Sequence, residues 1–69
     1  MFLVEEKRSP NGLRCAQIYM RDDGLFEGRI YGSESEQSGR LLKRSGFEVC
    51  GVTETLPRLE PIVDEELGL

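Results

Sequence analysis

The side chains that could carry out chemistry in this chain are few: two cysteines and thirteen carboxylates, with no histidine. Without histidine there is no ordinary Ser–His or Cys–His pair to activate a nucleophile. Cys15 has no evident activating partner, and the adjacent Glu5 and Glu6 point to opposite faces of a predicted strand. Two carboxylates can still meet through the fold, so a catalytic pair stays open. The sequence nevertheless predicts no enzyme and no cofactor.

Metal sites and disulfides are not expected either. Two cysteines without a histidine cannot supply the four ligands of a structural zinc. The run from Asp22 to Gly24 lacks the alternating ligand spacing of a calcium loop and is typical of a turn. Cys15 and Cys50 fall on predicted strands with another strand between them, about 10 Å apart. A disulfide needs Cα atoms within about 7 Å, so we predict free thiols.

The composition limits the kinds of partner and the cellular compartment that we expect for this chain. No stretch approaches the ~20 apolar residues of a membrane span, no signal peptide precedes the domain, and cysteine is sparse, so we expect a cytoplasmic protein. The net charge is −4, and residues 47–69, with six acidic side chains and one basic, carry −5 between them. An acidic chain is a poor candidate for binding the phosphate backbone, which needs clustered cations.

Three predicted strands form an antiparallel meander. Residues 2–8 alternate weakly and residues 13–21 and 25–31 strongly, and the runs Ser9 to Gly12 and Asp22 to Gly24 separate them as turns. We expect three-residue loops closed by a left-handed glycine, because that register collects the apolar side chains on one face. The predicted pairs on that face are Phe2 with Met20, Val4 with Ile18, Met20 with Phe26, Ile18 with Gly28, and Ala16 with Ile30.

A helix is predicted over residues 34–44. Ser33 and Glu36 have the spacing of a capping box, cations follow near the end, and Gly46 suits the stop. Its apolar face is weak, so its small residues are expected to let it lie close over Gly28. The alternative is a poor helix held by packing.

A fourth strand is predicted over residues 47–53, with Phe47 and Val49 pointing inward. It is expected to run parallel to the first and third strands, through a right-handed crossover, at either edge of the meander. The tail, residues 54–69, is predicted to dock, either as a short helix from Glu60 to Leu67 or as an edge strand over 58–63. The expected architecture is a single α+β domain over 1–69 with the order β-β-β-α-β and a docked tail.

One helix covers one face of such a sheet, so the second face is the candidate contact surface. Tyrosine and arginine are enriched at binding hot spots. Three outcomes are open for this face: the tail covers it, a second copy docks on it, or another protein does. The second face is predicted to present Leu3, Glu5, Lys7, Cys15, Gln17, Tyr19, Arg21, Leu25, Glu27, Arg29 and Tyr31.

The leading functional hypothesis is a non-enzymatic protein-binding module. A small acidic protein suits an inhibitor of the kind phages and mobile elements use against host nucleic-acid-handling proteins. It would act by occlusion through Leu3, Tyr19, Arg21, Arg29 and Tyr31, or by acidic mimicry of phosphates. The mimicry candidates are Glu48, Glu54, Glu60, Asp64, Glu65 and Glu66, for which solubility is the simpler explanation. The alternatives are a nucleic-acid-binding regulator with a Tyr/Arg sheet face, and a structural homodimer or accessory subunit. No small-molecule substrate and no membrane partner are expected.

Overall fold

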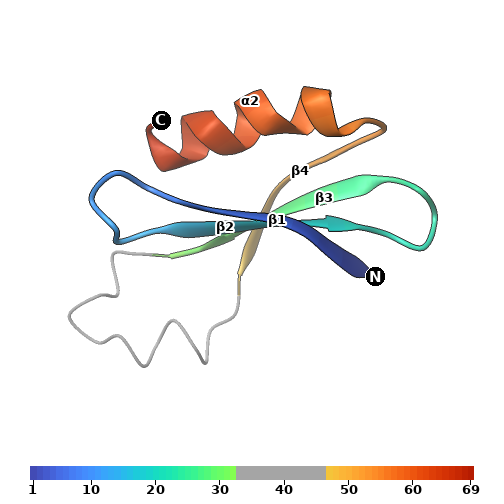
Figure 1. The fold of residues 1–69 in the computed structure, drawn as a ribbon, viewed down its shortest axis with the longest axis horizontal. Coiled ribbons are helices and arrows are strands. Elements are labelled where there is room, and N and C mark those ends of the chain that lie inside the picture. Colours follow the sequence, from blue (N-terminus) through green and yellow to red (C-terminus); the bar gives the residue numbers. More distant parts are fainter. Residues whose placement is uncertain (33–46) are drawn as a thin grey trace.

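The described residues form a two-layer arrangement of one antiparallel sheet and one helix (Figure 1). A computed structural model describes residues 1–32 and 47–69. The strands are β1 (Phe2–Arg8), β2 (Cys15–Met20), β3 (Phe26–Tyr31) and β4 (Glu48–Thr53), in the order β1-β2-β3-β4, and the helix is α2 (Leu56–Leu67). The α+β class is therefore confirmed. The helix predicted over 34–44 lies outside the described residues, and within them no helix has the length and apolarity needed to cross a membrane.

The hairpin of β2 and β3 has the predicted register. Its loop runs from Asp22 to Gly24, and it is closed by a 2.7 Å hydrogen bond that the Arg21 N–H donates to the carbonyl of Leu25. Gly24 has a φ of 89°, the left-handed conformation that a glycine tolerates without strain. Every predicted pair between these two strands is confirmed, including Ile18 opposite Gly28. The alternation of apolar and polar side chains was a sufficient signal here because neither strand carries an irregularity.

Strand β1 contains a bulge that the alternation did not predict. Phe2 lies opposite Met20 as expected, but the register shifts after Leu3, so that Glu5, and not Val4, lies opposite Ile18. A bulge places two residues of one strand against one of the next and so exchanges the faces of everything that follows.

The consequence of the bulge is a correction to the predicted second face. Glu5 and Lys7 lie on the α2 side of the sheet, where they were not expected. The hairpin loop also runs one residue longer than predicted, since Ser9 donates its N–H to the carbonyl of Arg14 at 3.0 Å. Gly12 still takes the expected left-handed conformation, with a φ of 76°.

Strand β4 runs antiparallel to β3, so the predicted parallel orientation is wrong. Residues 30 and 48 are paired, and the rings of Tyr31 and Phe47 lie 5.8 Å apart. The end of β3 and the start of β4 are therefore side by side, and the chain need not cross the sheet between them. A parallel crossover is required only when the connection returns to the opposite end.

The predicted inward orientation of Phe47 and Val49 is also wrong. Val49 pairs with Arg29, and the Phe47 ring lies against Arg29 and Tyr31, on the face away from α2. Their side chains are 42% and 51% exposed. The register shifts between Gly28 and Arg29, so β4 does not keep a simple alternation along its length.

The tail forms the helix that builds the core. Leu59, Val63 and Leu67 recur every four residues of α2 and pack on Ala16, Ile18 and Ile30 of the sheet. This period places them on one helix face. The tail docks as predicted and is helical, but it covers the apolar face and not the tyrosine face. Its helix also begins earlier than expected, at Leu56, with Pro57 in the first turn and Gly68 closing it in the left-handed conformation.

The helix and the sheet approach each other closely at Gly28. A Cβ atom at this position would lie 2.9 Å from Cys50 Sγ, 3.1 Å from Val63 Cγ2 and 3.3 Å from Leu59 Cδ1. In the described residues α2 lies close over Gly28, whereas the predicted approach of the helix over 34–44 lies outside them. Gly51 lies directly opposite Gly28 on β4. Because neither residue has a side chain, the helix can pack directly on the backbone of both strands here.

Candidate functional site

The face of the sheet opposite α2 is the candidate site, and we call it the aromatic face. It is contributed by all four strands and by the residue that precedes β4. No helix or strand of the described residues covers it. Its members are Leu3, Gln17, Tyr19, Glu27, Arg29, Tyr31, Phe47, Val49 and Val52.

Arg29 occupies the centre of this face, between two aromatic rings. Its guanidinium carbon lies 4.5 Å from the centroid of the Tyr19 ring and 4.2 Å from that of Phe47. Its Nε donates a 2.6 Å hydrogen bond to Glu27, a carboxylate that is only 8% exposed. This hydrogen bond, first among several causes, raises the pKa of Arg29. The two rings and the hydrogen bond to Glu27 together hold the guanidinium in place.

Arg21 completes the neutralisation of Glu27. It lies 3.5 Å from Glu27 and 3.0 Å from Asp23, so the buried carboxylate has two arginine partners. A buried charge is tolerated only when it is paired in this way. Arg21 and Arg29 were both predicted as site residues. Glu27, whose role the sequence did not indicate, brings them together. Alternation alone places Glu27 and Arg29 on one face, and that spacing was the available signal.

Gln17 orients both tyrosines of the aromatic face. Its Oε1 accepts hydrogen bonds from the Tyr19 hydroxyl at 2.9 Å and the Tyr31 hydroxyl at 3.1 Å. The pKa of Tyr31 is raised, mainly by burial. Its hydroxyl group therefore stays protonated and can donate the hydrogen bond to Gln17. The predicted neighbourhood of these side chains is confirmed, but the shared acceptor could not be inferred from their spacing.

Exposed apolar side chains surround this polar centre. Leu3 lies opposite Tyr19 as predicted and is 45% exposed, while Val52 lies opposite Glu27 and is 41% exposed. With Phe47 and Val49 they form an apolar margin on both sides of Arg29. Phe47 and Val49 were predicted to point into the core, so the number of exposed apolar side chains on this face was predicted too low.

The two cysteines are free, as predicted. Burial is the main cause that raises the pKa of each thiol, and for Cys15 a hydrogen bond to Glu6 at 3.4 Å adds to it. A raised pKa favours the neutral thiol at neutral pH, and the thiolate is the nucleophilic form. Cys50 packs against the core, and Cys15 lies beside Glu6 on the other side of the sheet.

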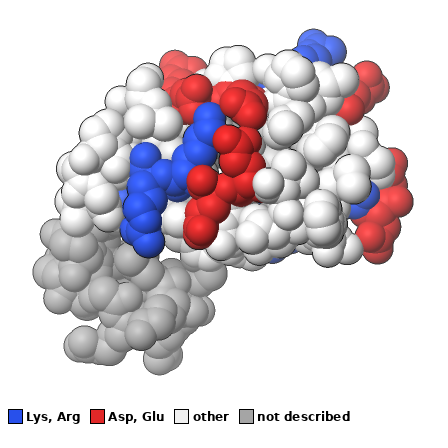
Figure 2. Space-filling model, in the orientation of Figure 1, with Lys and Arg blue, Asp and Glu red and all other residues white. Residues whose placement is uncertain are grey.

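The acidic candidates for mimicry do not form one continuous surface. Lys7 lies 2.7 Å from Asp64 and 3.3 Å from Glu60, and Arg14 lies 3.5 Å from Glu66. Figure 2 shows acidic side chains beside basic ones near the centre of that view. The remaining acidic candidates are exposed: Glu48, Glu54 and Glu65. Half of the six predicted acidic site residues are thus engaged in holding α2 to the sheet.

Glu5 adds a further carboxyl group to the Lys7 cluster and yields a pH prediction. A hydrogen bond with Glu60, the largest of several causes, raises the pKa of Glu5. A raised acid pKa means that the folded state is favoured below the unfolded pKa and loses this advantage as pH rises. Glu5→Gln is therefore expected to raise the free energy of unfolding at pH 7 by about 0.5 kcal/mol. Urea denaturation at pH 7 and pH 3.5 measures the effect, which should vanish at the lower pH. An equal gain at both pH values would show that charge is not the cause.

Comparison with known proteins provides no family for this fold and this arginine cluster. Neither the protein-family models, nor the curated proteins, nor the solved structures contain a match to the chain. The contacts of the aromatic face are therefore the basis on which a function is proposed.

Proposed function

We propose that the chain is a non-enzymatic protein-binding module that acts by occlusion, covering a site on its partner with the aromatic face. The observation that carries this proposal is the position of Arg29 between Tyr19 and Phe47, at the centre of a face with an exposed apolar margin. Binding energy at protein interfaces concentrates in such central clusters of aromatic residues and arginine. Arginine is enriched at interfaces, and the ion pair with Glu27 offsets the charge of Arg29.

The contacts that hold the cluster also favour tight binding. Arg29, Tyr19 and Tyr31 each have an intramolecular hydrogen-bond partner on this face. Ordering a flexible side chain on binding costs about 0.5–1.5 kcal/mol. Side chains that are already held in place avoid much of this cost. A preorganised face is suited to bind by surface complementarity.

Nucleic acid is a weaker candidate for the partner. Three arginines that could contribute to such binding are paired with carboxylates: Arg14 with Glu66, Arg21 with Asp23 and Glu27, and Arg29 with Glu27. Affinity for the phosphate backbone comes mainly from cations that are available to replace counterions. The net charge of −4 adds a long-range repulsion.

Occlusion through the aromatic face is also better supported than acidic mimicry. Glu60 and Asp64 are neutralised in part by Lys7, and Glu66 by Arg14. A phosphate mimic requires an uninterrupted row of carboxylates that a basic groove can engage. An inhibitor of the kind expected from the sequence would therefore cover its target mainly with apolar and aromatic surface.

The test compares two leucine-to-aspartate variants of matched exposure. Leu3 on the aromatic face is 45% exposed, and Leu13 in the loop between β1 and β2 is 42% exposed. The tagged wild-type chain is used to capture and identify a partner, and sedimentation establishes whether that partner is a second copy. Leu3→Asp is expected to raise the dissociation constant by at least about tenfold, since it places a charge in a desolvated contact. Leu13→Asp is expected to leave it unchanged.

Two results would contradict the proposal. One is equal affinity of both variants for the partner, with circular dichroism showing that both are folded. The other is a wild-type chain that sediments as a monomer and binds oligonucleotides tightly in a salt-dependent manner, because that would identify nucleic acid as the partner.

A further inference from the structure

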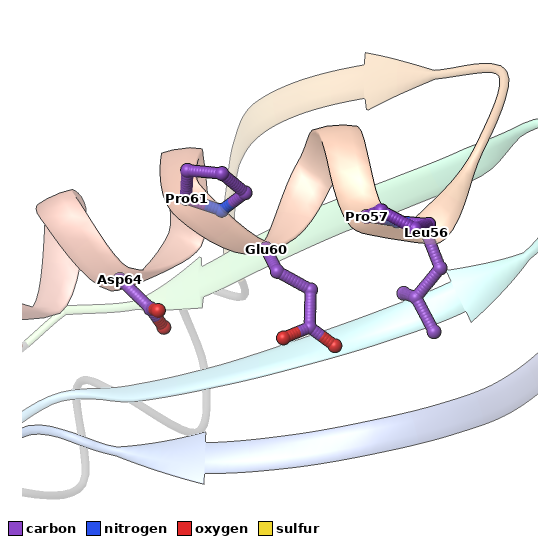
Figure 3. A pocket seen from close by; sticks show the side chains of 5 residues that line it. All are labelled: Leu56, Pro57, Glu60, Pro61 and Asp64. Atoms are coloured by element: carbon purple, nitrogen blue, oxygen red, sulfur yellow. The ribbon is translucent and has the colours of Figure 1, made fainter.

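A second concave surface lies on the α2 side of the sheet, away from the aromatic face. It has a volume of about 470 Å³ and is lined by Leu56, Pro57, Glu60, Pro61 and Asp64 (Figure 3). Glu60 and Asp64 extend from α2 toward the sheet, where both meet Lys7 of β1. We call this surface, together with the adjoining part of β1, the helix groove.

One end of the helix groove is apolar. The helix packs mainly on β4 and β3 and less on β2, and it reaches β1 through the ion pairs of Lys7 with Glu60 and Asp64. Phe2 and Met20 lie opposite each other at the end of the sheet where α2 begins, and they are 62% and 39% exposed. Leu56 starts the helix at the same end. Three apolar side chains, one from the helix and two from the sheet, therefore lie at this end of the two layers.

The other end of the helix groove carries excess negative charge. Three carboxyl groups, those of Glu5, Glu60 and Asp64, surround the single ammonium group of Lys7. Interaction with Glu60 raises the pKa of Glu5, as expected where carboxylates outnumber their cations. An additional positive charge brought to this end would relieve the repulsion between Glu5 and Glu60.

Pro61 indicates independently that the residues of this surface do not serve the stability of the fold alone. It lies inside α2, where a proline lacks the N–H that would donate to the carbonyl four residues earlier. Its side chain is exposed and lines the helix groove, so the core does not require it. Exceptions to local structural rules concentrate at functional sites.

We propose that the helix groove binds a basic amphipathic segment of another protein. In this complex a lysine or arginine of the segment lies beside Glu5, Glu60 and Asp64. An apolar side chain of the segment packs on Leu56 and Phe2. An amphipathic helix with its apolar anchors and basic residues along one side matches both ends of the groove. Because the charges are partly exposed, the interaction weakens as salt is added.

The probe is a fluorescently labelled helical peptide with leucines on one face and lysines along its edge. A second peptide has glutamate at every lysine position. Fluorescence anisotropy measures the affinity of each peptide for the full chain. The lysine peptide is expected to bind in a salt-sensitive manner and the glutamate peptide not to bind. Glu60→Gln is expected to weaken the lysine peptide about fivefold to tenfold, the range for loss of one favourable charge contact.

The matched control is Glu65→Gln, which removes the same charge from an exposed position of the same helix outside the groove. It is expected to leave the affinity unchanged, as is Leu3→Asp on the aromatic face. Should Glu60→Gln fail to fold, Leu56→Ala tests the apolar end, with an expected loss of about fivefold. The proposal is overturned if the lysine peptide does not bind the folded wild-type chain. It is equally overturned if the Glu60 and Glu65 variants bind the peptide alike.

Discussion

Replacing Leu59 with alanine is expected to leave most of the chain unfolded at 25 °C. Leu59 is fully buried, and its side chain packs over both glycines that seat the helix. A leucine-to-alanine change at such a site costs about 2–5 kcal/mol through lost burial and the cavity that remains. A domain of this length rarely has more than about 3–5 kcal/mol of stability. The expected loss is therefore comparable to the whole.

The matched control is Ile62→Ala on the neighbouring face of α2. Ile62 is 36% exposed, so its truncation removes less buried surface and is expected to cost about 1 kcal/mol or less. Far-UV circular dichroism with urea denaturation compares the two variants. A Leu59→Ala protein that unfolds at nearly the wild-type urea concentration would show that α2 does not build the core.

Replacing Gly28 with alanine is expected to lower the free energy of unfolding by about 2 kcal/mol. The added methyl group would meet Cys50 Sγ at 2.9 Å and Val63 Cγ2 at 3.1 Å, so the helix must move outward or side chains must leave their preferred rotamers. Overpacking of a filled core costs about 1–3 kcal/mol. The same change at Gly51 meets its neighbours at 3.4 Å and beyond, which is ordinary contact distance, and is expected to be nearly neutral.

A second substitution identifies the cause of the Gly28 effect. Cys50→Ala removes the nearest atom, so the double variant Gly28→Ala/Cys50→Ala is expected to be less destabilised than the sum of the two single changes. Such non-additivity is the signature of residues in contact. Urea denaturation of the four proteins completes the cycle. Additive effects would mean that Cys50 Sγ does not contact the methyl group added at Gly28.

The sequence was informative where local signals agreed with one another. In β2 and β3 the alternation, the left-handed Gly24 and the loop length all specify one register, and the structure has it. Tyr19 and Tyr31 therefore lie together on the face that was predicted for them. The core residues Ala16, Ile18 and Ile30 follow from the same alternation.

The sequence was uninformative where a single shift of register changes the outcome. A bulge after Leu3 moves Glu5 and Lys7 to the α2 side, and no residue type marks it in advance. In β4 the same uncertainty in register prevented the prediction that Phe47 contacts Arg29. In β1 the shifted register places Lys7 where it pairs with Glu60 and Asp64 of the helix, a contact between distant segments that alternation does not reveal.

The helix of the tail begins four residues earlier than the sequence indicated, at Leu56 and not at Glu60. Pro57 and Pro61 argue against a long helix by propensity, because each removes an N–H donor. Pro57 falls in the first turn, where that donor has no intrahelical partner in any case. Burial of Leu59, Val63 and Leu67 offsets the cost of Pro61. Tertiary packing thus overrides a signal that the sequence presents as a stop.

The separation of the two faces underlies both binding surfaces, and nuclear Overhauser effects measure it directly. The account predicts contacts from the Gly28 α-protons to the methyl groups of Leu59 and Val63. It also predicts contacts between the rings of Tyr31 and Phe47, and none from either ring to those methyl groups. Contacts from the Tyr19 or Tyr31 ring to the Leu59 or Val63 methyl groups would contradict it, because the helix would then cover the face proposed to bind a partner.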